Sequence, residues 1–531
     1  MSIQKKKLQI WLPLLFSLVM ILGIMIGYKL RENIRTAKSF FHIDKRSPLQ
    51  QVIDLIALKY VDPVNTDTLA NEAIEQILSR LDPHSVYIPP LELEEVNEDL
   101  QGNFQGIGVE FHIFQDTVNV INVLPKGPSD KAGLLTGDQF LKVEDSMVAG
   151  RKMTPEKIKK MLRGPGASEV RVTMLRGKKQ VDFTISRGRI PLPSIDAAYM
   201  INRQTGLIRI NKFSQTTYKE FMEAMEGLQS KGLKKLILDL RGNGGGILNE
   251  AVEIADEFLS NDKLIVYTQG NKSAKEEYRC KRPGLFEEGP LILITDEGSA
   301  SASEVLAGAL QDWDRATIIG RRTFGKGLVQ EQYDLADGSA LRLTVARYYT
   351  PSGRSIQKSY KGKGDYRQEI LDRYNHGEFV NADSNKIQHG KAYKTKSGRT
   401  VYSGGGIMPD IFVPFDTSSY SPTLTALNIS ATLTNFIYSY YIQHKEQFKT
   451  YRSAIDFATH FKQDEATWTE LVSYAAKDSI YLSKLPVSEK IVVQRRMKAL
   501  LARQPWRSEG FYQVLNLDDS VIKRALDNVE K

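Results

Sequence analysis

The chain has 531 residues, of which 41% are hydrophobic and 25% charged, so it is long enough for several folded domains and has an ordinary globular composition. Its net charge of +9 is spread along the chain rather than gathered in a tail, which argues against a nucleic-acid-binding protein. The single cysteine, Cys280, excludes an internal disulfide. Its polar neighbours include no histidine, which argues against a catalytic thiol.

The first predicted element is a membrane anchor. A basic N-terminus (1–9) precedes an apolar run from Ile10 to Tyr28, which as a helix would reach about 28 Å, close to the thickness of a bilayer's hydrocarbon core. A cleaved signal peptide is the alternative, but the run is longer than the usual apolar region and no small-x-small cleavage site follows it. We therefore expect an uncleaved transmembrane helix at 10–28. Basic residues on both sides leave its orientation open.

A small helical subdomain is expected at 44–100. Apolar residues recur at helical spacing in two stretches between Ser47 and Leu81, which predicts two amphipathic helices. Prolines then interrupt the pattern between Leu81 and Pro90, so an extended connector follows. His84 lies in this connector, and we interpret it as a structural residue.

Residues 104–188 predict a compact β-rich module. The segments Gly106-Ile107-Gly108-Val109, 128–134 and Gly137-Asp138 resemble a PDZ domain, as do a helix starting at Thr154-Pro155 and a hairpin around 176–178. A glycine loop that leads into a strand exposes backbone N–H groups to a carboxylate, and the strand edge accepts an extended peptide. A tight turn without a ligand would explain an isolated Gly-x-Gly. The whole pattern favours a receptor for free C-termini, bound at Gly106, Ile107, Gly108 and Val109.

Residues 189–356 alternate short apolar strands with amphipathic helices, which predicts a βαβ core. The expected strands are 236–240, 291–295 and 317–319, and the expected helices are 249–259 and 302–311. A polar, basic stretch at 357–403 is typical of an insertion or mobile segment. A return strand at 404–415 should rejoin the core, and 421–531 is helical by pattern but has no recognisable role. The fold class is thus multidomain α+β.

Three stretches of the core carry candidate chemistry. In 298–304 a buried strand runs through small residues into a helix, which places Ser301 at a helix N-terminus, where backbone N–H groups stabilise an oxyanion. Ser301 and Glu304 also form a capping box, which is a sufficient structural explanation for this stretch alone.

The second stretch, 323–327, places Lys326 between two glycines. A lysine acts as a base only when burial lowers its pKa, and a surface-loop lysine is the plainer interpretation. The third stretch, 238–246, is a strand that ends in a glycine-rich loop. Exposed N–H groups there could face a reacting carbonyl, although a flexible turn explains the loop equally well. It lacks the Gly-Lys-Ser/Thr of a phosphate-binding loop.

Together with the PDZ-like module, these stretches resemble the carboxyl-terminal processing peptidases, or tail-specific proteases, over residues 44–415. The resemblance implies that Ser301 is the nucleophile, Lys326 the general base and Gln330 the residue that orients the lysine. It also implies oxyanion-hole donors at the Ala302 amide and in the glycine loop. We choose Gly245 for the second donor, and its neighbour Gly244 remains open.

The family further implies a serine endopeptidase with a crotonase- or ClpP-like core that acts on proteins or peptides with free C-termini. The seven histidines show no metal-ligand spacing, so we expect no metal, and no cofactor is expected either. We expect a single-pass protein of a bacterial-type inner membrane, with its catalytic part periplasmic or otherwise extracytoplasmic. The sequence leaves open the substrates, the role of 421–531, and whether the protein forms homo-oligomers or needs an activating adaptor. An acyl-CoA enzyme of the crotonase type is disfavoured by the anchor and the tail-binding module. A silent scaffold is disfavoured by the Ser301/Lys326 pair.

Overall fold

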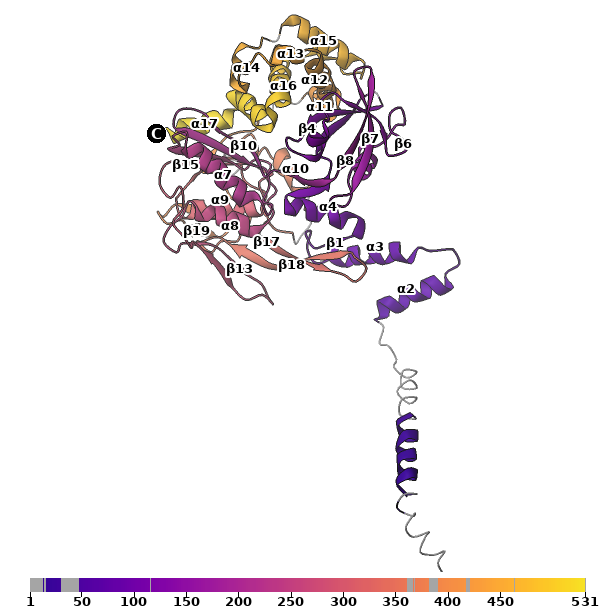
Figure 1. The fold of residues 1–531 in the computed structure, drawn as a ribbon. Coiled ribbons are helices and arrows are strands. Elements are labelled where there is room, and N and C mark those ends of the chain that lie inside the picture. The colour runs from indigo at the N-terminus through magenta and orange to yellow at the C-terminus, as the bar shows by residue number, and fades with distance from the viewer. Residues whose placement is uncertain are drawn as a thin grey trace, which may run out of the picture. The chain divides into compact units, whose positions relative to one another are not determined.

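A computed structural model describes most of the chain, which divides into two compact units, 1–80 and 81–531. The ribbon is drawn in Figure 1. The described residues are 13, 16–29, 47–114, 116–360, 366, 368–381, 390–416, 421–462 and 464–530.

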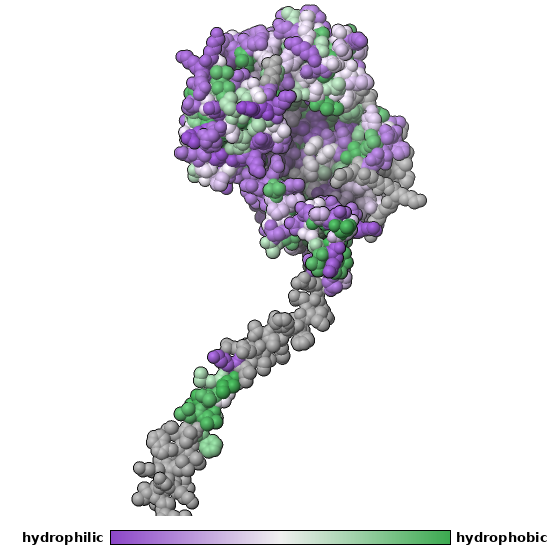
Figure 2. All heavy atoms as spheres, turned by 90° about the vertical axis from the view of Figure 1, so that its right-hand side faces the viewer, coloured by the Kyte–Doolittle hydropathy of each residue, from purple (hydrophilic) through white to green (hydrophobic). Residues whose placement is uncertain are grey.

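The first unit is helical. Its described part comprises a helix at 16–29 and the amphipathic helices α2 (Pro48–Lys59) and α3 (Thr66–Ser79), which are capped by Ser47 and Asn65. The helix at 16–29 is hydrophobic almost throughout (Figure 2). Part of the predicted anchor, 10–12 and 14–15, lies outside the described residues. Within the described residues, no helix combines the length and apolar character needed to cross a membrane.

A six-stranded sheet forms the centre of the second unit. All of its strands are parallel except the antiparallel edge strand β10, and the predicted return strand is present as β21. The crossovers that join the four inner parallel strands contain helices, as the alternating pattern predicts. The strand order is β10 (Ile195–Met200), β11 (Thr205–Ile210), β12 (Lys235–Asp239), β15 (Leu291–Thr295), β16 (Thr317–Gly320), β21 (Ile411–Phe412).

Both faces of this sheet are covered, because successive strand side chains point to opposite sides. On β12, Leu236 and Leu238 join the cluster formed with α7 (Thr217–Gln229), α8 (Leu248–Asp256) and α9 (Ala302–Asp312). Ile237 points the other way and packs with apolar side chains of the C-terminal helix α17 (Ser520–Val529). The last helix of the chain is therefore part of the core's packing.

A second, antiparallel sheet lies beside the first and carries the lysine loop. Lys326 lies two residues before β17, which pairs with the long strand β18. β18 also pairs with β1, so the proline-rich connector after residue 81 is fixed against the same sheet. The strands are β1 (Val86–Ile88), β13 (Leu264–Gln269), β14 (Glu276–Arg279), β17 (Leu328–Asp334), β18 (Ala340–Tyr349).

The β-rich module has its own core and the predicted hairpin. Helix α4 (Pro90–Gln101) and the ribbon β2 (Asn103–Gly106) with β9 (Gly188–Pro191) connect it to the protease sheets. Thr154 caps α6, as the Thr-Pro pair predicts. The module comprises β3 (Val109–Phe114), β4 (Thr117–Val123), α5 (Pro128–Ala132), β5 (Gln139–Val143), β6 (Ser146–Met147), α6 (Pro155–Leu162), β7 (Glu169–Arg176), β8 (Lys179–Ser186).

The described parts of the 357–403 insertion are anchored to the core rather than detached from it. They include helix α10 (Glu369–Asn375) and the hairpin of β19 (Ala392–Lys394) and β20 (Thr400–Tyr402). Glu378, just after α10, forms buried ion pairs with Arg322 and Arg373. The described part of the insertion therefore contains regular structure that buried ion pairs hold to the core, and its mobility stays a prediction.

The C-terminal region is helical, as predicted, with its own apolar core. The long helix α16 is interrupted near Pro505, where Arg507 has φ 56°. Figure 1 shows these helices beside the β-rich module, and α17 beside the protease sheet. The helices are α11 (Pro422–Ile429), α12 (Thr432–Gln443), α13 (Lys445–Phe448), α14 (Ala454–His460), α15 (Glu465–Ala476), α16 (Val487–Leu515), α17.

Candidate active site

Ser301 lies in the turn between β15 and α9, as predicted, and directly precedes the first residue of the helix. Its backbone has φ 57° and ψ −117°, a conformation that L-residues rarely adopt and that persists only where the surroundings impose it. α9 is buried along its whole length, so the helix start cannot shift easily. The turn presents the serine side chain at the N-terminal end of a fixed helix.

The Glu304 carboxylate holds the serine turn and the lysine loop together. It accepts hydrogen bonds from the backbone N–H of Ser301 at 2.9 Å and that of Lys326 at 2.8 Å, both on the same oxygen. Its other oxygen accepts from the Gly325 N–H at 2.8 Å and the Thr323 hydroxyl at 2.5 Å. The backbones of the two predicted catalytic residues are therefore close neighbours.

Glu304 is fully buried. Burial raises the pKa of its carboxyl group to about 7, although the four hydrogen bonds favour the charged form. The sequence pattern identified Glu304 only as the partner of Ser301 in a capping box. Its hydrogen bonds to Thr323, Gly325 and Lys326 depend on the tertiary structure. Glu304 therefore fixes the lysine loop in addition to capping the helix.

Lys326 is half-buried at the start of the second sheet. Burial lowers the pKa of its amine below the usual range, and the nearby positive charge of Arg342 lowers it further. No hydrogen bond joins the Lys326 amine to the Ser301 hydroxyl among the described residues. The structure thus brings the two loops together without forming the direct contact.

Tyr348 forms the side-chain hydrogen bond to Ser301. Its side chain is buried on β18, and its hydroxyl donates to Ser301 Oγ at 3.0 Å. Burial raises the pKa of Tyr348, so the hydroxyl stays protonated and remains a donor. The sequence analysis did not single out this residue, because only the pairing of the second sheet places it against the serine.

The glycine-rich loop packs directly on Ser301. A Cβ atom on Gly245 would lie 2.7 Å from Ser301 Cβ and 2.9 Å from the Ala302 nitrogen, so only glycine fits. The Ala302 N–H makes no hydrogen bond within the described chain and remains available to a ligand. The Gly245 N–H, however, donates to the Asn243 side chain at 2.8 Å. The Gly244 amide makes no hydrogen bond among the described residues.

A buried cluster of charged side chains fixes the start of the glycine-rich loop. Asp239, at the end of β12, accepts hydrogen bonds from Arg241 and Arg209. Burial alone would raise the pKa of Asp239, but the two arginines outweigh it and lower the pKa to about 2. Arg241 also pairs with Asp519 at 2.7 Å, so the C-terminal region helps to fix the start of the loop.

Gln330 lies on β17 beside a register shift and donates to Thr344 Oγ1 at 3.5 Å, not to Lys326. The Thr344 hydroxyl in turn donates to Asp82, which accepts three further hydrogen bonds from the backbone and hydroxyl of the His84-Ser85 turn. The structure therefore links the predicted orienting glutamine to the connector, and it places no hydrogen bond between that glutamine and the lysine.

His84 reaches the site as part of the same turn. Its Nε2 atom is 3.0 Å from the hydroxyl of Tyr366, a residue of the insertion. Burial lowers the pKa of His84 to about 4, and the charge of Lys326 contributes in the same direction. The connector and the insertion thus meet near the lysine.

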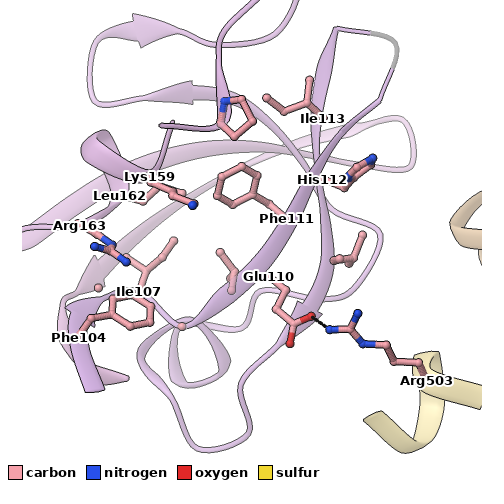
Figure 3. A pocket seen from close by; sticks show the side chains of 15 residues that line it. Phe104, Ile107, Glu110, Phe111, His112, Ile113, Lys159, Leu162, Arg163 and Arg503 are labelled. Carbon is pink, nitrogen blue, oxygen red and sulfur yellow. Dashed lines mark ion pairs between the residues drawn. The ribbon is translucent and has the colours of Figure 1, made fainter. Parts of the chain in front are cut away.

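The predicted carboxylate-binding residues lie at one end of a groove in the β-rich module. The loop 106–109 leads into β3, whose outer edge pairs with no strand among the described residues. The groove runs between β3 and α6 and has a volume of about 550 Å³ (Figure 3). It can receive an extended chain along the free strand edge.

Comparison with known proteins identifies the domains in which these residues lie. Residues 204–364 match the model of peptidase family S41, residues 105–186 match the PDZ domain, and residues 423–507 match a family of unknown function. A carboxy-terminal-processing protease from Bartonella bacilliformis is 36% identical over 313 residues, which are 58% of this chain and 71% of the relative. A CtpA-like serine protease from Staphylococcus aureus strain N315 is 32% identical over 358 residues, which are 65% of this chain and 70% of the relative.

Among solved structures, the photosystem II D1 C-terminal processing protease is 27% identical, with a TM-score of 0.36, and the match covers 67% of this chain and 85% of that chain. The fold and the sequence matches define a serine peptidase that carries a PDZ domain. More particularly, the chain belongs to the carboxyl-terminal processing peptidases of family S41.

Proposed function

We propose that the protein hydrolyses peptide bonds with a Ser301/Lys326 dyad, in proteins whose free C-termini are held by the PDZ domain. The observation that carries this proposal is the Glu304 carboxylate, which binds the backbones of both residues on one oxygen atom. The lowered pKa of Lys326 supports its role, because a base must be neutral to accept a proton.

In the proposed reaction, the neutral Lys326 amine accepts the Ser301 proton while Oγ bonds to the substrate carbonyl carbon. The resulting oxyanion is stabilised by the Ala302 N–H and by an amide of the glycine loop. Collapse of the intermediate breaks the C–N bond, and the leaving amine takes the proton from Lys326. Water, deprotonated by Lys326, then cleaves the acyl-enzyme and restores Ser301.

Two contacts must rearrange before this reaction. Lys326 has to reach the Ser301 hydroxyl. Where Gly245 rather than Gly244 is the second donor, the Gly245 amide has to release Asn243 or share its proton with the oxyanion. Contacts of this kind tighten in substrate complexes of many enzymes. We assign this rearrangement to binding of the substrate's C-terminal tail. Proteins without an accessible tail would then not be cleaved.

We also propose that residues 10–28 anchor the protein in a membrane, with the catalytic part outside the cytoplasm. The anchor is supported by the nearly uninterrupted apolar run behind the basic residues of 1–9. The side of the membrane rests on the proposed function, because basic residues flank both ends of the run. Fractionation of cells that express the full chain tests the anchor. The chain should sediment with membranes and resist extraction by high salt, whereas a variant lacking residues 1–30 should be released.

The experiment that tests the dyad follows cleavage of an unstructured protein with a free C-terminus. Ser301→Ala and Lys326→Ala should each reduce cleavage by at least about 10³-fold, because nucleophile and base act as one unit. The control is Lys219→Ala, whose side chain lies exposed on α7. Full cleavage by either dyad variant would refute the proposed mechanism.

A further inference from the structure

The edge strand of the PDZ domain faces two different parts of the protein. Val109, Phe111 and Ile113 pack towards the PDZ core. The alternate side chains of β3 turn to the C-terminal helices: Glu110 pairs with Arg503 of α16, and the ring of Phe114 stacks on Tyr474 of α15. Alternate residues of one strand therefore contact two separate structures.

A second cavity, of about 210 Å³, lies on this other face. It is closed by β3 and β4 of the PDZ domain on one side and by α12 and α16 on the other. Glu110, His112, Ile121 and Arg503 line both this cavity and the tail-binding groove, so the two spaces adjoin. Figure 3 shows Arg503 reaching Glu110 from a separate helix.

The C-terminal helices are held firmly against the PDZ domain at this place. Arg507 donates to the Val123 carbonyl at 2.9 Å, and its strained backbone, with φ 56°, turns the helix after Pro505. Tyr438 of α12 donates to the Val120 carbonyl at 3.4 Å. Arg503 is therefore presented to the groove by a braced helix and not by a free loop.

A tail that adds to the free edge of β3 would direct its side chains alternately to the same two faces. One set would fill the apolar groove beside Phe111. The other set would enter the space beside Arg503 and His112. The Nε2 atom of His112 is buried and has no hydrogen-bond partner within the described chain. The wall of the second cavity therefore contains a polar atom that is available to a ligand.

The charges at this place favour an acidic side chain. Glu110 is the single acidic residue that lines either cavity among the described residues, against Lys159, Arg503 and Arg507; a fourth cation, Arg163, is already paired with Glu98 at 2.8 Å. The Arg503–Glu110 pair is 3.6 Å long, and about half of each side chain is exposed, so it is weak and can be exchanged for a ligand carboxylate.

We propose that Arg503, in the region of otherwise unknown role, is a specificity-determining residue that selects substrate tails with an acidic side chain on the face opposite the apolar groove. The inference rests on the proposed capture of C-termini by the PDZ domain. It gives the C-terminal region a function in the same reaction, because one helix completes the binding site of another domain.

The test measures binding of fluorescent tail peptides to the full chain carrying Ser301→Ala, which prevents cleavage. One Glu is moved through the last four positions of an apolar peptide and compared with Gln at each position. Glu should bind about 3- to 5-fold more tightly than Gln at alternate positions only, and high salt should remove the difference. Arg503→Ala should abolish this preference and change the affinity for the Gln peptides less than about 2-fold.

Two further variants separate selection from a merely structural role. Glu110→Gln removes the competing carboxylate and should strengthen binding of the Glu peptides, the opposite sign to Arg503→Ala. Arg495→Ala is the matched control, since Arg495 lies on the same helix, is equally exposed and also pairs with a carboxylate. It should keep the preference of the parent protein.

The same binding experiment distinguishes failure of the proposed role of Arg503 from failure of the proposed capture of C-termini. Amidation of the peptide C-terminus should weaken every tail; if amidated tails bind equally well, capture of C-termini is wrong. If free tails bind better but Glu and Gln are equal at every position, Lys is preferred, or the preference survives Arg503→Ala, then the role of Arg503 alone is refuted.

Discussion

At the scale of single residues, the site depends on a few side chains whose partners lie far away in the chain. Glu304 bonds to residues about twenty positions further on, and Tyr348 reaches Ser301 from another sheet. Sequence motifs relate residues that are close together in the chain. The resemblance of two such motifs to a known family identified Ser301 and Lys326, but no motif assigned a role to Tyr348. Residue types could not predict that the described chain forms no direct hydrogen bond between Lys326 and Ser301.

Replacement of Tyr348 by Phe tests whether its hydroxyl positions the nucleophile. Loss of one hydrogen bond to Ser301 Oγ should lower kcat by about 3- to 10-fold and leave KM nearly unchanged, because the buried ring is kept and only the nucleophile loses a partner. Steady-state kinetics measures the effect. Tyr349→Phe is the matched control, and its ring stacks on Tyr267 away from the serine. Unchanged kcat in Tyr348→Phe would exclude this positioning role.

The pH dependence of cleavage tests the charge state of Lys326. Burial and the charge of Arg342 lower the lysine pKa, and the base must be neutral, so kcat/KM should rise as pH increases through that pKa. Arg342→Gln removes a repulsive charge. The pKa of Lys326 should then rise, and the acidic limb of the pH–rate profile should move to higher pH. A shift to lower pH, or none, would contradict this electrostatic account.

At the scale of helices and strands, prediction succeeded where the pattern is local. Strand 291–295 matches β15 to the residue, and the helix expected at 302–311 differs from α9 by one residue, since buried apolar runs and caps mark their ends. The second sheet was not predicted. Its strands β17 and β18 are half-polar and pair with distant partners, so no short-range signal identifies them.

Buried ion pairs beside helix α10 attach the insertion to the core, and their contribution to stability can be measured. Glu378 is buried and pairs with two buried arginines, one of which lies four residues before Lys326. Glu378→Ala leaves both charges without this carboxylate and should reduce the free energy of unfolding by about 3–5 kcal/mol. Denaturant unfolding measures this loss. Asp372→Ala, which removes an exposed carboxylate of α10, should cost less than about 1 kcal/mol. Equal losses would show that burial of the pair is unimportant.

At the scale of the whole molecule, the C-terminal region contacts both functional parts. α16 borders the tail-binding groove, while α17 covers the protease sheet and Asp519 pairs with Arg241 at the glycine loop. The sequence predicted the helices of this region but not these contacts, because they depend on which helix faces meet other domains.

Asp519→Asn tests the link between this region and the glycine loop. Asn still caps α17 but cannot pair with Arg241, so kcat should fall by about 3- to 10-fold with little change in thermal stability. Asp518→Asn, on the neighbouring exposed carboxylate, is the control. If Asp519→Asn loses stability but not activity, the ion pair only supports the fold.

The central claim is that Lys326 activates Ser301, and covalent labelling tests it most directly. A phosphonate reagent for catalytic serines is incubated with the full chain, and the modified residue is located by tandem mass spectrometry. The account predicts one adduct, on Ser301, whose rate of formation falls at least about 100-fold in Lys326→Ala. An adduct on another residue, or an unchanged rate in Lys326→Ala, would contradict it.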